Sequence, residues 1–182
     1  MTWLELFASA FGLANMLLLA RRSVWNFPCG MVMVALFALI FFQARLYAVA
    51  GLQLFFLAAQ IHGWWAWHRA PADAGSVTVR RLEARHWPLV ILSATLLSVA
   101  AAALLRQTDA AAPIADGSVA AWSLAAQLLT NLRMVESWPL WAAINVASVA
   151  LYASQSLWVT AGLYTLFLGI ALYSWRTWHV AA

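Results

Sequence analysis

Residues 46–57, LYAVAGLQLFFL, align without a gap with residues 157–168, LWVTAGLYTLFL. Six of these twelve positions are identical. The difference in residue number between 46 and 157 is here called the repeat offset. The same offset relates Arg22 to Arg133, Pro28 to Pro139, Trp64 to Trp175, Trp67 to Trp178 and His68 to His179. The chain therefore contains an internal repeat. A duplicated membrane unit of this length is typical of small transporters, which bind their substrate between the two halves.

The composition excludes a soluble domain. The 182 residues are 65% hydrophobic and only 9% charged, so a folded chain in water would expose more apolar surface than it could cover. The solvent is therefore lipid, and at roughly 20 apolar residues per crossing the chain has room for about seven transmembrane helices. The basic residues are all arginines at helix ends, where membrane topology explains them, so we expect no nucleic-acid partner.

The apolar runs predict the order of the helices. The first three and the last three runs form the two copies, and the run between them matches neither. Because one helix separates the copies, both enter the membrane from the same side. The sequence thus predicts an all-α integral membrane protein with seven transmembrane helices in a parallel 3+1+3 repeat. The predicted helices cover residues 3–20, 28–43, 47–67, 87–105, 118–132, 138–155 and 157–175.

The domain boundaries follow from this repeat. Residues 1–68 form the first three-helix bundle, and residues 118–182 form the second. Residues 69–117 comprise a cytoplasmic loop, the linker helix at about 87–105 and an external loop. Eight of the ten arginines fall on one side of the predicted helices, which by the positive-inside rule places the N-terminus in the periplasm and the C-terminus in the cytoplasm.

Polar side chains inside the predicted helices indicate a substrate site. Such groups are costly in lipid and usually face a cavity or another helix. In the run 138–155, tryptophans, Asn145, a serine and a tyrosine recur at intervals of three and four, which places them on one helix face. Intramembrane amides also serve as interhelical contacts, but amides from three helices at similar depth favour a pocket. The predicted substrate-binding residues are Gln53, Gln60, Trp64, Gln127, Trp141, Asn145, Tyr164 and Tyr173.

The same residues restrict the transport mechanism and the type of ligand. No carboxylate is predicted deep in a helix, and His62 is the only candidate for a buried titratable group, so the sequence favours facilitated diffusion over proton coupling. Amides and aromatic rings suit a neutral or singly cationic ligand with hydroxyl and carboxamide groups. We expect no catalytic residues, no cofactor and no metal, because a nucleophile with a base is missing and Cys29 is the only cysteine.

Several motifs resemble the PnuC family of bacterial vitamin transporters, and the resemblance spans almost the whole chain. The matching segments are Trp25-Asn26-Phe27-Pro28-x-Gly30, Phe41-Phe42-Gln43-Ala44-Arg45-Leu46-Tyr47-Ala48, Gly51-Leu52-Gln53-Leu54-Phe55-Phe56, His62-Gly63-Trp64-Trp65-Ala66-Trp67, Ala126-Gln127-x-Leu129 and Glu136-Ser137-Trp138-x-x-Trp141-x-x-x-Asn145.

The resemblance implies a facilitator for nicotinamide riboside in the bacterial inner membrane. It also implies a SWEET-like fold, a homotrimer and a supply of riboside for NAD synthesis. Rocking of the two bundles about a fixed site would give alternating access. Gln53, Gln127, Trp141, Asn145 and Tyr164 fall on motif positions expected to line the pocket, with Gln60 and Trp64 in the same stretch.

Other interpretations remain open. A facilitator of the same family could carry thiamin or riboflavin, because the family includes such members and thiamin is also an aromatic cation. A non-transporting assembly subunit would use its buried amides as helix contacts. An intramembrane enzyme or haem protein is disfavoured, since it would need a buried nucleophile with its base or a second buried histidine.

Overall fold

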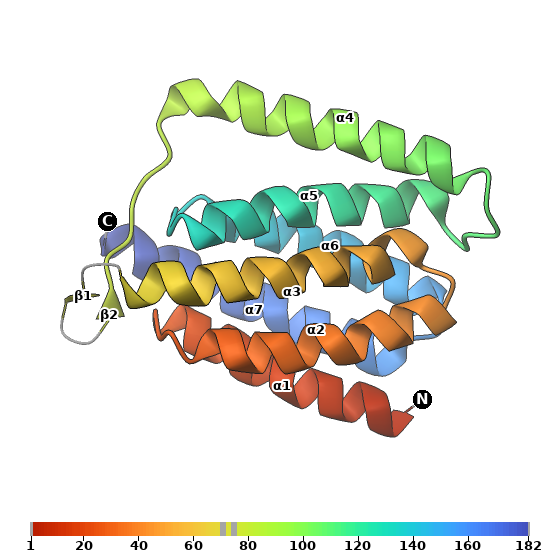
Figure 1. The fold of residues 1–182 in the computed structure, drawn as a ribbon, viewed down its shortest axis with the longest axis horizontal. Coiled ribbons are helices and arrows are strands. Elements are labelled where there is room, and N and C mark those ends of the chain that lie inside the picture. Colours follow the sequence, from red (N-terminus) through yellow and green to blue (C-terminus); the bar gives the residue numbers. More distant parts are fainter. Residues whose placement is uncertain (1, 70–71, 74–75, 182) are drawn as a thin grey trace.

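The computed structural model describes residues 2–69, 72–73 and 76–181. In this part of the chain, seven long helices run side by side along one direction, and the two termini lie at opposite ends (Figure 1). The helices are α1 (Thr2–Ala20), α2 (Asn26–Gln43), α3 (Tyr47–His68), α4 (Trp87–Leu105), α5 (Pro113–Asn131), α6 (Ser137–Ser154) and α7 (Trp158–Val180).

The long connection between α3 and α4 holds the remaining short elements. Strands β1 (Ala72–Asp73) and β2 (Ser76–Val77) pair antiparallel, and the 3-10 turn η1 (Ala84–His86) leads into α4. Between them, the backbone of Arg80 pairs with the turn that joins α5 to α6, through Arg80 N to Arg133 O and Val135 N to Arg80 O, both 2.9 Å. The connection is therefore attached to the second half of the molecule.

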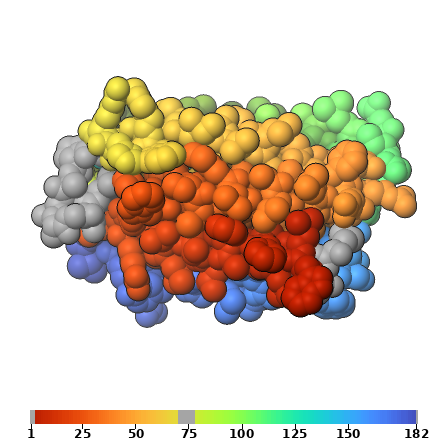
Figure 2. Space-filling view, turned by 60° about the horizontal axis from the view of Figure 1, so that its bottom comes forward, coloured from red at the N-terminus to blue at the C-terminus, as the bar shows by residue number. Residues whose placement is uncertain are grey.

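Six helices close into a ring. Around it, α1 packs on α2, α2 on α3, α3 on α5, α5 on α6, α6 on α7, and α7 returns to α1. Helix α4 lies outside the ring against α5, at the top of Figure 1. Figure 2 shows a long face of the molecule that the side chains of α1, α2 and α3 cover in successive bands.

The helix boundaries repeat with the sequence. The repeat offset carries both ends of α1 onto those of α5, and both ends of α2 onto those of α6. The turns repeat as well: among the described residues, positive φ at a non-glycine position occurs at Arg22 and Arg133, at 57° and 63°, and at Arg45 and Ser156, at 54° and 59°. In each turn the next backbone N–H bonds back into the helix, as Leu157 N does to Tyr152 O at 2.9 Å.

The distribution of apolar and polar side chains between surface and interior fits a lipid environment. Large apolar side chains such as Phe42, Leu54 and Leu89 are about two-thirds exposed, while Gln53 and Asn145 are buried. By length and composition, four helices of the described residues are apolar enough to span a membrane: α1, α2, α4 with the preceding turn, and α7. The three less apolar helices, α3, α5 and α6, carry the buried amides Gln53, Gln60, Gln127, Asn131 and Asn145, which lower their mean hydropathy.

Two boundaries differ from the sequence prediction by five residues, the end of α7, which lies at Val180 and not at 175, and the start of α5. The prediction places residues 107–117 in an external loop and begins the fifth helix at 118, whereas α5 begins at Pro113. Proline is well tolerated in the first helical turn. The early start also buries Asp116, which is 0% exposed. A carboxylate that the sequence assigns to a loop is thus part of the interior.

Candidate functional site

The centre of the helix ring holds amide side chains from three helices. Gln53 and Gln60 come from α3, Gln127 and Asn131 from α5, and Asn145 from α6, and all five are at most 8% exposed. Asn131 donates through Nδ2 to the carbonyl of Ala59 at 3.0 Å, which connects α5 to α3. Gln127 donates to Asn131 Oδ1 at 2.9 Å, and Gln53 to its own helix at the Val49 carbonyl, at 3.1 Å.

Two of these amides keep an unused polar atom. Among the described residues, Gln60 Oε1 and Asn145 Nδ2 are buried without a hydrogen-bond partner, as are hydroxyl groups of three serines, including Ser148, and the indole N–H groups of Trp67 and Trp138. A buried polar atom without a partner costs about 1–3 kcal/mol. One of the two atoms is an acceptor and the other a donor, so together they match a ligand that carries both groups, as a carboxamide does.

Gly30 allows Gln60 to occupy the centre. A Cβ added at Gly30 would lie 2.7 Å from Cδ of Gln60 and 2.8 Å from Nδ2 of Asn15, both too close for a side chain. Asn15 is 8% exposed and donates through Nδ2 to the carbonyl of Asn26 at 2.8 Å. The sequence prediction omits Asn15, although an asparagine inside the apolar run of α1 was a visible signal.

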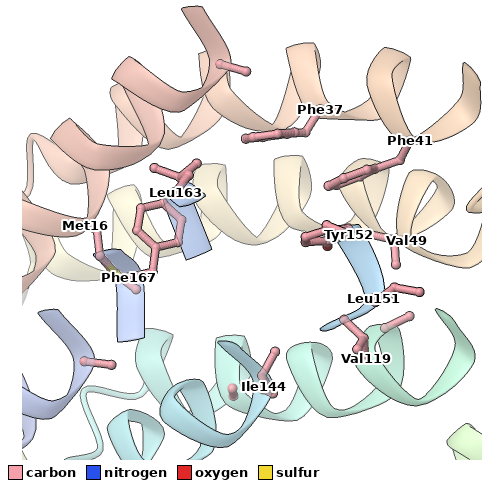
Figure 3. Close-up of a cluster of buried hydrophobic side chains, with 14 of the residues drawn as sticks. Met16, Phe37, Phe41, Val49, Val119, Ile144, Leu151, Tyr152, Leu163 and Phe167 are labelled. Carbon is pink, nitrogen blue, oxygen red and sulfur yellow. The ribbon is translucent and has the colours of Figure 1, made fainter. Parts of the chain in front are cut away.

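Aromatic rings close the centre at one end. Phe41 of α2 and Tyr152 of α6 stack with ring centroids 5.0 Å apart, and Tyr152 also meets Tyr164 of α7 edge-on at 4.8 Å. Phe167 continues the layer on α7, 5.3 Å from Tyr164. Figure 3 shows the Phe41 ring next to Tyr152, with Phe37 beside Phe41 on the same helix.

A second aromatic layer closes the other end. Phe27, Trp67, Trp138 and Trp178 are each 1% exposed. Trp67 and Trp178 lie 6.3 Å apart between their ring centroids, and each meets a further ring edge-on at 5.2 Å, Phe27 for Trp67 and Trp138 for Trp178. Asn145 lies midway between Trp138 and Tyr152 along α6, about 10 Å from each layer. Asn145 therefore lies between the two aromatic layers.

Two further predicted residues lie beside this centre. Trp141 of α6 is half-buried, donates through Nε1 to Thr130 Oγ1 of α5 at 3.0 Å, and has its ring 6.4 Å from that of Phe56. Tyr164 is half-buried within the first aromatic layer. Both connect the amides to the surrounding rings.

Trp64 and Tyr173 lie apart from the other predicted residues. Trp64 is 37% exposed and donates through Nε1 to His68 Nε2 at 3.3 Å on the outer surface. The buried face of α3 is centred between Gly63 and Trp67, which leaves Trp64 on its edge. Tyr173 is 66% exposed because it lies two residues, about 200° of helix, from buried Ala171. His62 is also exposed, on the outer side of α3.

Two buried carboxylates are missing from the sequence prediction. Asp116 of α5 accepts the backbone N–H groups of Ala48 and Val49 at 3.1 and 3.0 Å, so it caps the first turn of α3 from a neighbouring helix. Glu5 is the equivalent of Asp116 in the first repeat, and it accepts the hydroxyl of Thr160, in the first turn of α7, at 3.5 Å. The equivalence of the two acids was the signal that could have found them.

The end of the molecule that carries Trp67 and Trp178 is positively charged. Arg133 lies in the turn after α5, where burial lowers the pKa of its guanidinium and the positive charge of Arg80 lowers it further. Arg81 reaches the C-terminal end of α7 and donates to the carbonyl of His179 at 3.2 Å.

Among the described residues no group of three metal-ligating side chains is present.

A family model described as "Nicotinamide mononucleotide transporter" matches residues 2–180. The chain belongs to this transporter family. Within the family, it is 31% identical to the nicotinamide riboside transporter PnuC of Escherichia coli strain K12, over 98% of this chain and 85% of that protein. The resemblance to PnuC proteins that the motifs indicate is thereby confirmed.

Other family relatives differ in the vitamin named. The chain is 25% identical to the PnuC nicotinamide riboside transporter of Neisseria mucosa, over 97% of this chain and 72% of that protein. It is also 25% identical to the riboflavin/roseoflavin transporter RibM of Streptomyces davaonensis, over 97% and 84% of the two chains. A crystal structure of the vitamin B3 transporter PnuC matches the fold with a TM-score of 0.83 at 22% identity, covering 100% of this chain and 84% of that one.

Proposed function

We propose that this family member is a nicotinamide riboside transporter of the bacterial inner membrane. The observation that carries the proposal is the pair of unused atoms, Gln60 Oε1 and Asn145 Nδ2, between two aromatic layers. A nicotinamide group offers a carboxamide N–H for the first, a carboxamide oxygen for the second and a cationic ring for the aromatic faces. The name of the 31% identical E. coli relative supports the same ligand.

The substrate site comprises the predicted residues that the fold brings together: Gln53, Gln60, Gln127, Trp141, Asn145 and Tyr164. Trp64 and Tyr173 are excluded because they face outward. The exposed position of His62, together with the absence of a carboxylate among the central amides described above, supports facilitated diffusion without proton coupling. Cytoplasmic consumption of the riboside for NAD synthesis would then keep the flow directed inward.

The proposed architecture is a SWEET-like, parallel 3+1+3 arrangement in which all seven helices cross the membrane. Its support is the constant offset of helix ends and turns, and the equal directions of α1 and α5 in Figure 1. The arginine distribution places the N-terminus in the periplasm and the C-terminus in the cytoplasm. A homotrimer is the assembly that the family resemblance implies.

Transport proceeds by rocking of the two triplets about the amide layer. In the described part of the chain, the triplets pack on each other chiefly at two seams, α3 with α5 and α1 with α7. Separation of Phe41 from Tyr152 opens the site toward one side, and separation of Trp67 from Trp178 opens it toward the other. Both contacts join opposite triplets, so a relative rotation of the triplets changes them together.

Uptake into liposomes that contain only the purified protein tests the function. We expect entry of radiolabelled nicotinamide riboside, and its loss in Asn145→Leu, which removes the donor. Val146→Leu is the matched control, since Val146 is 58% exposed on the neighbouring position of α6. Entry of riboflavin or thiamin in preference to the riboside would move the assignment to another vitamin. A complete lack of entry would favour the non-transporting subunit.

A further inference from the structure

A groove of about 620 Å³ lies at the seam between α1 and α7, toward the end where α1 finishes (Figure 1, left). Leu17 and Arg21 line it from α1 and the turn that follows, and Gly169, Ile170 and Tyr173 line it from α7. The groove thus lies between a helix of the first triplet and a helix of the second. It is separate from the central amides, and it shares with the proposed transport site the ring of Trp178, which forms part of its wall.

The repeat is not exact at this seam, which leaves less side-chain volume beside the groove. At the equivalent seam between α5 and α3, Asn131 extends its side chain to the carbonyl of Ala59 at 3.0 Å. The equivalent of Asn131 in the first repeat is Ala20, which has no polar side chain, and this seam is instead bridged by Trp178 of α7, whose Nε1 donates to the Ala20 carbonyl at 3.2 Å. Gly169 adds further room, since a Cβ at this position would meet no atom within 4 Å.

One end of the groove is positive. Arg21 is exposed and Arg22 half-buried at its rim, and none of the described residues that line it is acidic. The wall of the groove therefore holds no negative charge that would repel an anion. A guanidinium group at such a rim favours a phosphate-type anion, with which it forms charge-assisted hydrogen bonds.

The other end of the groove is apolar and opens sideways. Leu17, Gly169 and Ile170 lie one to two helical turns farther from the arginines, and Leu17 is 46% exposed on the surface that faces lipid. Tyr173 lies between the two ends, 66% exposed, where an amphipathic ring is suited to the level of the headgroups. A free phosphate would use only the charged end, whereas a phospholipid would use both.

We infer that this groove is a binding site for an anionic phospholipid, with its phosphate at the arginine rim, chiefly on Arg21, and an acyl chain along Leu17, Gly169 and Ile170. The lipid would contact one helix from each triplet, at the seam where Ala20 replaces a bridging asparagine. Bound there, it adds to the hydrogen bond from Trp178 to the Ala20 carbonyl in stabilising the closed seam. The inference holds for any vitamin that the protein carries.

Thermal unfolding of the detergent-purified protein tests the site, with added phosphatidylglycerol compared with phosphatidylcholine of the same chains. A ligand that binds only the folded state raises the unfolding temperature, so we expect phosphatidylglycerol to raise it by about 3 °C or more above phosphatidylcholine. Arg21→Gln should abolish this difference. Arg176→Gln is the matched control, because Arg176 is an exposed arginine at the same end of α7 that does not line the groove.

A second variant tests the acyl-chain half of the groove. Gly169→Leu places a side chain in open space, so the protein should fold and transport normally while native mass spectrometry shows less retained phosphatidylglycerol. Equal stabilisation by both lipids, or an unchanged preference in Arg21→Gln, would overturn the inference. So would an equal shift from glycerophosphate without acyl chains, which would indicate a simple anion site, or full lipid retention by Gly169→Leu.

Discussion

Phe41 and Tyr152 occupy equivalent positions in the two repeats, and their rings stack on each other with centroids 5.0 Å apart and planes inclined by 12°. A residue that touches its own counterpart lies where the two halves meet. Trp67 and Trp178 are a second such pair, 6.3 Å apart. The repeat therefore places one aromatic contact on each side of the buried amides, and a solute that crosses the centre has to pass both.

Loss of the first contact should open one side of the centre. Phe41→Ala removes a fully buried ring, which we expect to cost about 3–5 kcal/mol of unfolding free energy. It should also speed the reaction of a small thiol reagent with a cysteine placed at Ser148, which is 0% exposed between Asn145 and Tyr152. The measurement uses a Cys29→Ser background.

Phe42→Ala is the control for this experiment, since Phe42 is 65% exposed on the next position of the same helix. It should leave both stability and labelling near those of the parent. Equal labelling of position 148 in the two alanine variants would mean that the Phe41 ring does not close the centre.

The two helix-capping carboxylates should differ in how much they stabilise the folded protein. Asp116 accepts two backbone N–H groups at 3.0 and 3.1 Å, whereas Glu5 accepts one hydroxyl at 3.5 Å. Hydrogen bonds to a charged group contribute about 1.5–3 kcal/mol each, and long bonds contribute less. We therefore expect Asp116→Asn to lower the thermal unfolding temperature clearly more than Glu5→Gln, measured in one detergent at neutral pH. A larger loss from Glu5→Gln would contradict this ranking.

Gly30 should be needed for ligand binding. Gly30→Ala places a Cβ 2.7 Å from Cδ of Gln60, so Gln60 has to leave its position in the centre. Because the displaced amide can no longer present its oxygen, we expect about a tenfold weaker affinity for nicotinamide riboside, or about 1.4 kcal/mol. Isothermal titration calorimetry would measure it. Gly169→Ala is the control, and an unchanged affinity in Gly30→Ala would remove Gln60 from the site.

The turn after α6 offers a stabilising change. Ser156 has a φ of 59°, a left-handed conformation that costs a residue with a side chain about 1 kcal/mol relative to glycine. Ser156→Gly should therefore raise the unfolding free energy by up to that amount, seen as a higher unfolding temperature. Ser154→Gly, at the last residue of α6, should not stabilise the protein, and a lower temperature for Ser156→Gly would show that its side chain makes a needed contact.

The sequence predicts the order and ends of most helices because two independent patterns agree. The apolar runs locate the helices, and the equivalence of Pro28 and Pro139 aligns their starts. It also identifies Gln53, Gln60, Gln127 and Asn145, since an amide inside an apolar run is conspicuous wherever the helix packs. Asn15 and Asp116 are also polar residues inside helices, but the sequence prediction does not include them. Asp116 is omitted because the alanine-rich segment before it resembles a loop.

The direction of a side chain at the edge of a helix face could not be predicted from periodicity. Trp64 follows Gln60 by one helical turn, yet it faces outward, because small Gly63 lets Phe27 and Asn131 approach the other edge of α3. Periodicity gives the positions of residues relative to one another around a single helix. Packing against the neighbouring helices decides which of these positions faces the centre of the ring. The same reason places Tyr173 outside.

By itself, the sequence determined a duplicated, lipid-embedded helical chain with polar groups in its interior, because apolar length and the repeat offset are properties of the linear chain. The tertiary structure decided which equivalent residues meet, such as Phe41 with Tyr152, and which amides keep an atom free. It also decided that one seam is bridged by Asn131 and the other by Trp178, beside the groove at Ala20. These features depend on distances between helices far apart in the chain, which only close packing sets.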